Sequence, residues 1–294
     1  TVSRALRNSH LVNEETRKRV HDIAKQLNYK VDKNASNLRT QQSSTLALLL
    51  FEDPTSDESQ INPFFLSMLG SITRACAKEG YDLLVSFQSA SADWQADYED
   101  SHRADGIILL GYGDYIDFQP KFKTLLDQNT KFVCWGATVD NRPDLTVCCD
   151  NYGGGKLAAD HLIAHNRTDC AFIGDASDHS PEFFARFQGF KDELLTNGIT
   201  INERKMANAI STEESGYHAT RSLIANNIKF NALFAASDLI AIGAIRALKE
   251  ANINVPNEVA VVGFDNIAIA SYINPPLTTI AQDTTVAGQM LVEN

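Results

Sequence analysis

Several short motifs in the chain carry residue types that bind phosphate or cofactors, and each lacks a partner that the chemistry requires. Residues 153–156 (GGGK) superficially resemble a phosphate-binding loop, but such a loop needs Ser or Thr directly after its Lys, where Leu157 stands. Residues 111–113 (GYG) follow an apolar run, yet Ile116 occupies the place of the third Gly in a dinucleotide fingerprint. We therefore expect no nucleotide cofactor.

Candidate metal ligands and nucleophiles are incomplete in the same way. His161 and His165 share a helix face, but Leu162 stands where the zinc-peptidase motif HExxH has Glu. Cys148 and Cys149 are adjacent in an expected strand, so their side chains point to opposite faces and make a poor chelate. The sequence contains no GxSxG nucleophile elbow. We expect no bound metal, no cofactor and no catalysis.

Charge is distributed unevenly along the chain, whose net charge is -11. Residues 1–44 contain nine Lys and Arg against four Asp and Glu, a net charge of +5, whereas residues 45–294 carry -16. A short basic segment ahead of a long acidic one is typical of a polyanion-binding module joined to a part that does not bind polyanions. A solvated basic helix is the alternative that charge alone leaves open.

Composition bounds the class of protein. The 294 residues, of which 44% are hydrophobic, suffice for about two domain-sized units. No apolar run approaches the ~18 residues of a membrane-spanning helix, so we expect no membrane partner. Five scattered cysteines, an odd number, argue against a secreted disulfide framework, and we expect a soluble protein of the cytoplasm.

The basic segment has the pattern of two short helices followed by a polar stretch. In residues 1–8 two apolar side chains four apart share one side, and Arg4 projects from another. Asn13 is expected to cap the second helix, because two Glu follow it where the helix dipole favours acids. Residues 31–42 are too short and too polar to fold alone. Because the chain begins inside its first helix and without Met, we expect it to be truncated there.

Residues 45–281 alternate between short apolar runs and amphipathic stretches. The expected strands are residues 45–51, 81–87, 106–110, 131–135, 146–149, 170–173, 232–235, 259–264 and 278–281. The expected helices between them include residues 64–78, 154–165, 181–197, 212–226 and 239–251. This alternation predicts parallel sheets with helices on both faces, and nine strands predict two adjacent α/β subdomains.

The order and spacing of several motifs closely resemble the lactose-repressor (LacI/GalR) family. In the basic segment the matching motifs are TVSRAL (1–6), VNEETR (12–17), LNY (27–29) and LRT (38–40). Six further landmarks follow in order: NPFF (62–65), DN (150–151), RFQGF (186–190), SD (237–238), VVGFDN (261–266) and PPLTTI (275–280). The resemblance spans essentially the whole chain and is far more specific than any single motif.

The resemblance implies two doubly wound parallel-sheet α/β lobes, similar to periplasmic sugar-binding proteins, preceded by a partial helix-turn-helix head and hinge. The head and hinge are then expected over residues 1–44. The N-terminal effector-binding lobe is expected over residues 45–150 plus 278–294, and the C-terminal effector-binding lobe over residues 151–277. The family's first helix would precede Thr1 and its third crossover would follow Asn294, so both ends are expected to be cut.

The resemblance also implies DNA contacts from the head and hinge. A recognition helix in the major groove would let Arg4 offer a bidentate fork to guanine, with Thr1 and Ser3 contacting phosphate or base. Leu38 falls where the family inserts a leucine into a minor-groove base step, although Val31 replaces the usual proline at the start of the hinge. A linker residue packing loosely on the body is the alternative for Leu38.

An effector site made by Phe64, Phe65, Asp150, Arg186 and Asp265 is the third implication of the resemblance. Carboxylates after strands can accept hydrogen bonds from sugar hydroxyls, and the guanidinium supplies up to five donors in a rigid fork. The aromatic rings offer flat apolar faces for the C–H side of a sugar or for a purine. Such a set suits a neutral polyhydroxylated ligand.

Each of these residues also has a purely structural interpretation. The two phenylalanines could belong to the core, and Asp150 could cap the helix that follows it. Arg186 could pair with Glu182 one turn earlier, and Asp265 could be a turn residue. The Ser-Asp pair at 237–238 departs from the family's usual Asn-Asp, and we interpret Asp238 as the N-cap of the next helix.

These features together predict a DNA-binding transcription regulator, usually a repressor. Its homodimer would bind operator DNA under the control of a small-molecule effector, a sugar or sugar derivative. The alternative is a periplasmic-type solute-binding protein without DNA function, for which a signal peptide and a neutral or acidic N-terminus would be expected. A sugar-processing enzyme is disfavoured by the incomplete catalytic motifs.

Overall fold

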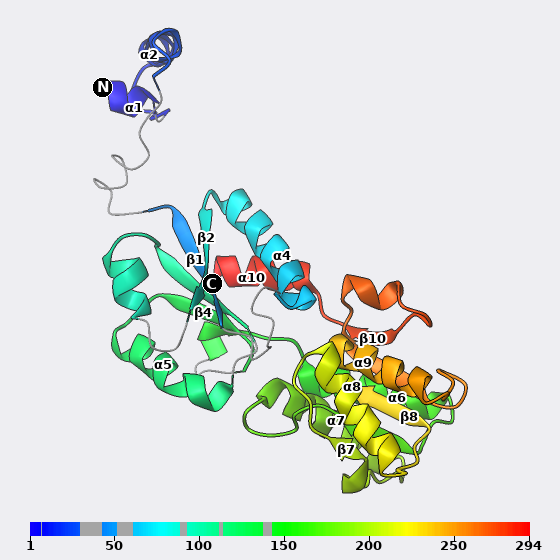
Figure 1. Ribbon diagram of the computed structural model, residues 1–294. Coiled ribbons are helices and arrows are strands. Elements are labelled where there is room, and N and C mark those ends of the chain that lie inside the picture. The colour runs from blue at the N-terminus through cyan, green and yellow to red at the C-terminus, as the bar shows by residue number, and fades with distance from the viewer. Residues whose placement is uncertain (7, 30–42, 52–60, 89–92, 112–113, 138–142) are drawn as a thin grey trace.

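The computed structural model describes residues 1–6, 8–29, 43–51, 61–88, 93–111, 114–137 and 143–294. These residues form a small helical head and two α/β lobes (Figure 1). The hinge helix expected over residues 31–39, including Leu38, lies outside the described residues.

The head contains α1 (Val2–Leu6) and α2 (Glu14–Gln26). Asn13 caps α2 as the sequence predicts, because its side chain accepts the Thr16 N–H at 2.8 Å. Ala5 and Val12 are the buried apolar side chains of the head's described residues. The head is therefore a small unit whose described core is limited to two side chains.

The first lobe is a five-stranded parallel sheet in the order β2-β1-β3-β4-β5. Its elements are β1 (Thr45–Phe51), α4 (Pro63–Glu79), β2 (Asp82–Gln88), the π-helical turn η1 (Gln95–Asp100), β3 (Gly106–Leu110), α5 (Tyr115–Asp127), β4 (Phe132–Trp135), the 3-10 turn η2 (Pro143–Leu145), β5 (Thr146–Val147) and α10 (Thr284–Glu293). Leu48 and Leu50 of β1 pack with α4 and α10, whereas Ala47 and Leu49 pack with α5. Burial on both faces explains why β1 is a continuous apolar run rather than an alternating one.

The second lobe is a five-stranded parallel sheet in the order β10-β9-β8-β6-β7. Its elements are α6 (Asn151–Ala164), β6 (Cys170–Ile173), α7 (Pro181–Thr196), the 3-10 turn η3 (Glu203–Lys205), β7 (Met206–Ala207), α8 (Glu213–Ala225), β8 (Ala232–Ala235), α9 (Asp238–Glu250), β9 (Ala260–Asp265), the 3-10 turn η4 (Ala268–Ser271) and β10 (Thr278–Ala281). Its core joins the sheet to all four helices, α6 to α9, through residues such as Leu162, Phe190, Leu223 and Leu248. The two doubly wound lobes predicted from the sequence are thus confirmed.

The return crossover between the lobes lies later in the chain than the sequence predicted. We expected residues 278–294 in the first lobe, and this is wrong for the first four of them. Thr278–Ala281 form β10, which pairs in parallel with β9 at the edge of the second sheet, as its two adjacent Thr and one Ile favour. Within this stretch α10 is the element that packs on the first lobe, against α4. The crossover is therefore residues 282–283.

None of the helices in the described part of the chain combines the length and apolar character that crossing a bilayer requires.

Candidate functional site

Arg186 is the centre of a polar cluster inside the second lobe, and its side chain is almost completely buried. Its Nε donates to Asn151 Oδ1 at 2.8 Å, and its Nη1 donates to the Ala236 carbonyl at 2.5 Å and to Asp265 Oδ1 at 3.4 Å. The Phe264 ring lies under the guanidinium, with its centroid 3.7 Å from Cζ. The alternative pairing with Glu182 does not describe this site, because the guanidinium ion-pairs with Asp265 and the Glu182 carboxylate accepts the Ala137 N–H at 2.8 Å.

Close packing of α6 against α7 puts Arg186 in reach of Asn151. Gly155 on α6 faces the carbonyl of Arg186, and Gly189 on α7 faces the carbonyl of Tyr152. A Cβ at either position would overlap that carbonyl, so only glycine allows the two backbones to approach this closely. The glycine run at 153–155 is thus part of a helix rather than a phosphate loop, and its last member, Gly155, allows α7 to lie next to the start of α6.

Asp265 is the last residue of β9, and it meets Arg186 at the carboxyl end of the sheet. Its backbone has φ 113°, a conformation that residues with a Cβ rarely adopt. Burial raises the pKa of its carboxyl to about 7, although Arg186 and a hydrogen bond from Gln282 favour the charged form. Gln282 Nε2 donates to Asp265 Oδ1 at 2.6 Å. A carboxylate held here under strain and with a raised pKa is a strong candidate for ligand contact.

The N-cap of α9 is Ser237, and our assignment of that role to Asp238 is wrong. The Ser237 hydroxyl accepts the Ile240 N–H at 3.4 Å, and Asp238 is the first helical residue. Asp238 is fully buried and instead holds the segment after β9, because Oδ2 accepts the Ile267 N–H at 2.8 Å and Oδ1 accepts the Thr279 hydroxyl at 2.5 Å. Burial raises its pKa to about 6.

Asp150 is exposed and caps α6, accepting the Gly153 N–H at 2.7 Å with Oδ1. The structural interpretation of this residue is therefore correct. Its exposure leaves the carboxylate open to solvent at the point where the chain enters the second lobe. Asn151, which directly follows it, orients Arg186.

Phe64 and Phe65 are buried in the core of the first lobe, with 1% and 5% of their surface exposed. Phe64 lies 5.9 Å from the Trp135 ring, centroid to centroid. The two rings are therefore core residues in this arrangement, as the structural alternative stated, and a ligand could meet them only if the lobes or the start of α4 moved. Asn62, which caps α4, reaches the second lobe instead: its Nδ2 donates to Ser211 Oγ at 3.3 Å.

The carboxyl ends of both sheets face each other. Asp114 precedes α5 after β3, and its Oδ2 lies 2.5 Å from Nδ1 of His179, which follows β6. The Tyr115 N–H donates to the His179 carbonyl at 3.0 Å. The hydrogen bond that Nδ1 of His179 donates to the Asp114 carboxylate raises the pKa of His179, which strengthens this contact while the imidazole is protonated. Together with Ala137–Glu182 and Asn62–Ser211, these bonds place Arg186 and Asp265 in the lobe face that meets the first lobe.

The sequence prediction missed Gln282, Asn62 and the contact made by Asn151. The motifs DN and NPFF contain two of these residues, so a signal was present, but the pairing of each depends on how helices and lobes dock. Gln282 follows the motif PPLTTI and had no signal of its own. Gln282 reaches Asp265 because it lies in the crossover at residues 282–283, and the sequence analysis placed this crossover elsewhere.

The predicted DNA-contacting residues of the head lie on or next to α1. Thr1, Ser3 and Arg4 are exposed, whereas Ala5 on the same helix is buried. The side of α1 that carries Arg4 is thus free of the packing that holds the head together.

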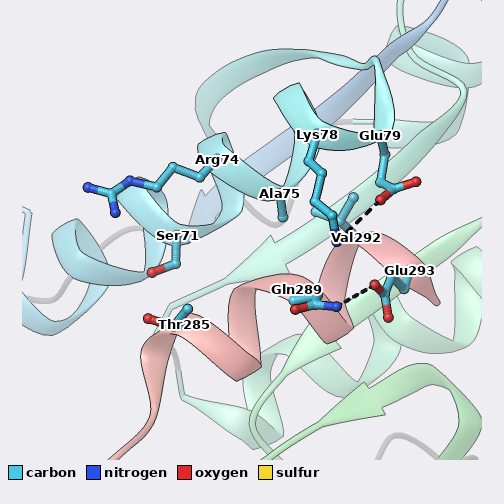
Figure 2. A pocket seen from close by; sticks show the side chains of 9 residues that line it. All are labelled: Ser71, Arg74, Ala75, Lys78, Glu79, Thr285, Gln289, Val292 and Glu293. Carbon is cyan, nitrogen blue, oxygen red and sulfur yellow. Dashed lines mark hydrogen bonds and ion pairs between the residues drawn. The ribbon is translucent and has the colours of Figure 1, made fainter.

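A separate pocket of about 180 Å³ lies between α4 and α10 (Figure 2). Figure 2 shows Lys78 next to Glu79 and the Gln289 amide bonded to Glu293, a hydrogen bond of 2.6 Å. Its volume is below the roughly 300–1,000 Å³ of ordinary small-molecule sites, Lys78 pairs with Glu79, and Glu293 accepts from Gln289. It is therefore a poor candidate for the effector site. Among the described residues, no three His, Cys, Asp or Glu side chains converge as metal ligands.

Two protein families match this chain. Residues 159–294 match the periplasmic binding protein-like domain, and residues 1–32 match the family described as bacterial regulatory proteins, lacI family. The first match covers most of the second lobe and α10, and the second match covers the head.

Individual relatives are similar over nearly the whole chain. The HTH-type transcriptional regulator AscG of Escherichia coli strain K12 is 30% identical over 287 residues, which cover 95% of this chain and 82% of AscG. The ribose operon repressor of the same strain is 27% identical over 296 residues, covering 100% of this chain and 87% of the repressor. A solved complex of the transcriptional regulator CelR with cellobiose has a TM-score of 0.75 and 27% identity, and covers 100% of this chain and 86% of that one. These relatives are regulators rather than enzymes.

Proposed function

Because the chain belongs to the lacI family of bacterial regulatory proteins, we propose that it is a DNA-binding transcriptional repressor controlled by a sugar-like effector bound at Arg186 and Asp265. The observation that carries the proposal is the buried Arg186–Asp265 pair at the strand ends that face the first lobe. A buried ion pair contributes little to stability, since desolvation offsets its attraction. A function in ligand recognition gives a reason for its presence.

The chemistry of the cluster suits an uncharged polyol. One cation and one carboxylate in contact leave little net charge for an ionic ligand, and both groups form hydrogen bonds. Sugar hydroxyls can donate to Asp265 and accept from Arg186 at the same time. The exposed carboxylate of Asp150 and the rings of Phe64 and Phe65 would complete the site as the lobes adjust around the effector. Cellobiose in the CelR complex supports this ligand class.

DNA binding belongs to the head. Residues 1–44 carry +5 against -16 for the rest, so attraction to phosphate is confined to this end of the chain. Arg4 would read a base edge, Thr1 and Ser3 would contact phosphate or base, and Leu38 would enter the minor groove. The proposal assigns no catalytic step to the chain.

A homodimer follows from this mode of DNA binding, because a single helix-turn-helix binds weakly and paired half-sites supply affinity. The first lobe offers a suitable surface. Its edge strand β2 exposes Val85 and Phe87, and 52% of the Phe87 surface is accessible. Exposed apolar side chains on a strand that lies at the edge of the described sheet favour association.

The effector would act by biasing the angle between the lobes. Contacts such as Asn62–Ser211 and Asp114–His179 already join the two faces in the described arrangement. A ligand that contacts both faces shifts the balance of lobe angles only by its difference in affinity for them. The dimer would then change the spacing of its two heads.

The test is a titration of the protein with D-ribose, cellobiose and adenosine, followed by thermal shift and calorimetry. At least one compound should stabilise the wild-type protein, and Arg186→Ala should abolish that stabilisation. Arg74→Ala is the matched control, because Arg74 is exposed on α4 beside the pocket of Figure 2. Equal binding by wild type and Arg186→Ala would contradict the proposed site.

A further inference from the structure

The C-terminal end of α6 carries two exposed histidines that lie side by side. His161 and His165 are one helical turn apart, and their ring centroids are 4.5 Å apart with 43° between the ring planes. Nδ1 of His165 lies 2.8 Å from the His161 carbonyl oxygen, and no other described residue forms a hydrogen bond with either ring. Neither ring belongs to the Arg186 cluster or to a contact between the lobes.

The bond to the backbone determines which nitrogen of His165 is available. A carbonyl oxygen only accepts, so Nδ1 of His165 carries the proton and donates, and Nε2 of the neutral ring keeps its lone pair. Histidines that bind metals usually donate their other ring N–H to a backbone carbonyl or a carboxylate, which fixes the orientation of the ring. His165 therefore has the tautomer and the orientation of a metal ligand.

The spacing of the two rings suits a single ion. Imidazole nitrogens lie about 2.0–2.1 Å from a bound Zn²⁺, so two of them on one ion are about 3.0–3.4 Å apart. Rings whose centroids are 4.5 Å apart can place one nitrogen each at that distance. The C-terminal end of a helix also carries a partial negative charge, which favours a cation there.

The absence of a catalytic glutamate does not remove these ligands. In the motif HExxH the two histidines bind the metal and the Glu is the general base, so Leu162 excludes the peptidase chemistry and leaves both ligands in place. No third His, Cys, Asp or Glu among the described residues joins the pair. A structural zinc site takes four protein ligands, so this pair suits an exchangeable ion whose other ligands are water. This arrangement revises our expectation of no bound metal.

We propose that His161 and His165 chelate a divalent transition-metal ion, which each ring binds through one nitrogen. Imidazole suits Cu²⁺, Ni²⁺ and Zn²⁺, whereas Mg²⁺ and Ca²⁺ prefer oxygen ligands. The site lies at the other end of α6 from Asn151, about 21 Å away at the helical rise of about 1.5 Å per residue. It is therefore separate from the Arg186 cluster, and the inference does not rest on the proposed function.

Calorimetric titration of the untagged protein with NiCl₂ at neutral pH tests the proposal. His161→Ala and His165→Ala should each weaken Ni²⁺ binding by about tenfold or more, because a single imidazole lacks the second ligand that the chelate holds at high effective concentration. His218→Ala is the matched control, since His218 is an exposed histidine on α8 that lies next to Glu214. Its affinity for Ni²⁺ should equal that of wild type.

A relocated pair separates chelation from binding by two independent surface histidines. Asp160→His combined with His161→Ala keeps the number of histidines but places the pair five residues apart, on different sides of α6. This double variant should bind Ni²⁺ as weakly as His161→Ala. Because the changed residues are exposed, all variants should unfold at the wild-type temperature in EDTA.

Thermal unfolding gives a second measurement of the same site. An ion that binds only the folded chain stabilises it, so NiCl₂ should raise the unfolding temperature of wild type and of His218→Ala above that of the other variants. MgCl₂ should have no such effect. Absence of Ni²⁺ binding by wild type, equal affinity in wild type and His165→Ala, or wild-type affinity in the relocated pair would each overturn the inference.

Discussion

Asp238 shows how a buried carboxylate can organise a site without touching a ligand. Its oxygens bond to Ile267 N–H and to the Thr279 hydroxyl, and Thr279 Oγ1 in turn accepts the Asn266 N–H at 3.3 Å. These bonds fix the segment that follows Asp265. Asp238 is therefore a positioning residue for Asp265, at the cost of keeping a charge away from water.

The burial of Asp238 predicts a defined dependence of stability on pH. Its pKa is raised from 3.8 to about 6 in the folded protein, so the folded state binds the proton more tightly than the unfolded state. The stability contributed by the protonated group is fully present below about pH 4 and is lost as the pH rises through 6. The free energy of unfolding of wild type, relative to Asp238→Asn, should fall by about 3 kcal/mol between pH 4 and pH 8.

Urea unfolding of both proteins at intervals across that range measures this difference. Asn can still accept from Ile267 and can donate to Thr279, so the variant is expected to fold. A difference between the two proteins that stays constant with pH would show that Asp238 does not titrate in this range.

The residue types of the site could be predicted from the sequence, but most of their contacts could not. Arg186 and Asp265 were predicted together, and they are in contact. Their partners Asn151 and Gln282 come from a helix start and a crossover, which are neighbours only after the chain folds. Phe64 and Phe65 fit either a ligand site or a core by composition, and only packing distinguishes the two.

At the level of elements, the packing of α6 against α7 determines where the guanidinium lies. Replacing Gly189 by Ala would drive a Cβ into the Tyr152 carbonyl. The variant should lose about 1–3 kcal/mol of stability by overpacking, and its effector affinity should fall because Arg186 moves relative to Asn151. Chemical denaturation and calorimetry measure the two effects.

Gly70→Ala is the control for that experiment. Gly70 lies in the interior of α4, and a Cβ there would meet no atom within 4 Å. Because Ala is a better helix former than Gly, this variant should be as stable as wild type or about 0.5–1 kcal/mol more stable. If Gly189→Ala behaved like Gly70→Ala, the close approach of the two helices would not matter for the site.

Element prediction succeeded for strands of four or more residues and failed where the apolar pattern was shorter or broken. The strands at 45–51, 106–110, 170–173, 232–235 and 278–281 match the predicted ranges. β7 has only two residues, too few for any periodicity, and was missed. α5 was not among the helices predicted from the sequence. It contains Pro120, and proline usually interrupts a helix. The lobe to which β10 belongs depends on strand pairing, which the local pattern does not contain.

In the whole molecule, DNA binding and effector binding are assigned to separate parts of the chain, so regulation requires that these parts be coupled. The head carries the positive charge, and the second lobe carries the Arg186 cluster. The first lobe lies between them in the chain and meets the second lobe through bonds such as Ala137–Glu182. Fold class and the two-lobed organisation could be predicted from the sequence because motif order persists over the chain. The bonds between the lobes could not be, since each joins residues far apart in the sequence.

The most direct test of this account measures DNA binding with and without the effector. A DNA fragment is first selected from a random library by the wild-type protein, and its dissociation constant is then measured at fixed salt concentration. The compound that stabilises wild type should change that constant by about fivefold or more, the usual range of coupling between sites. Arg186→Ala should bind the same DNA with no response to the compound. A compound that binds wild type and leaves its DNA affinity unchanged would contradict the coupling of pocket and head.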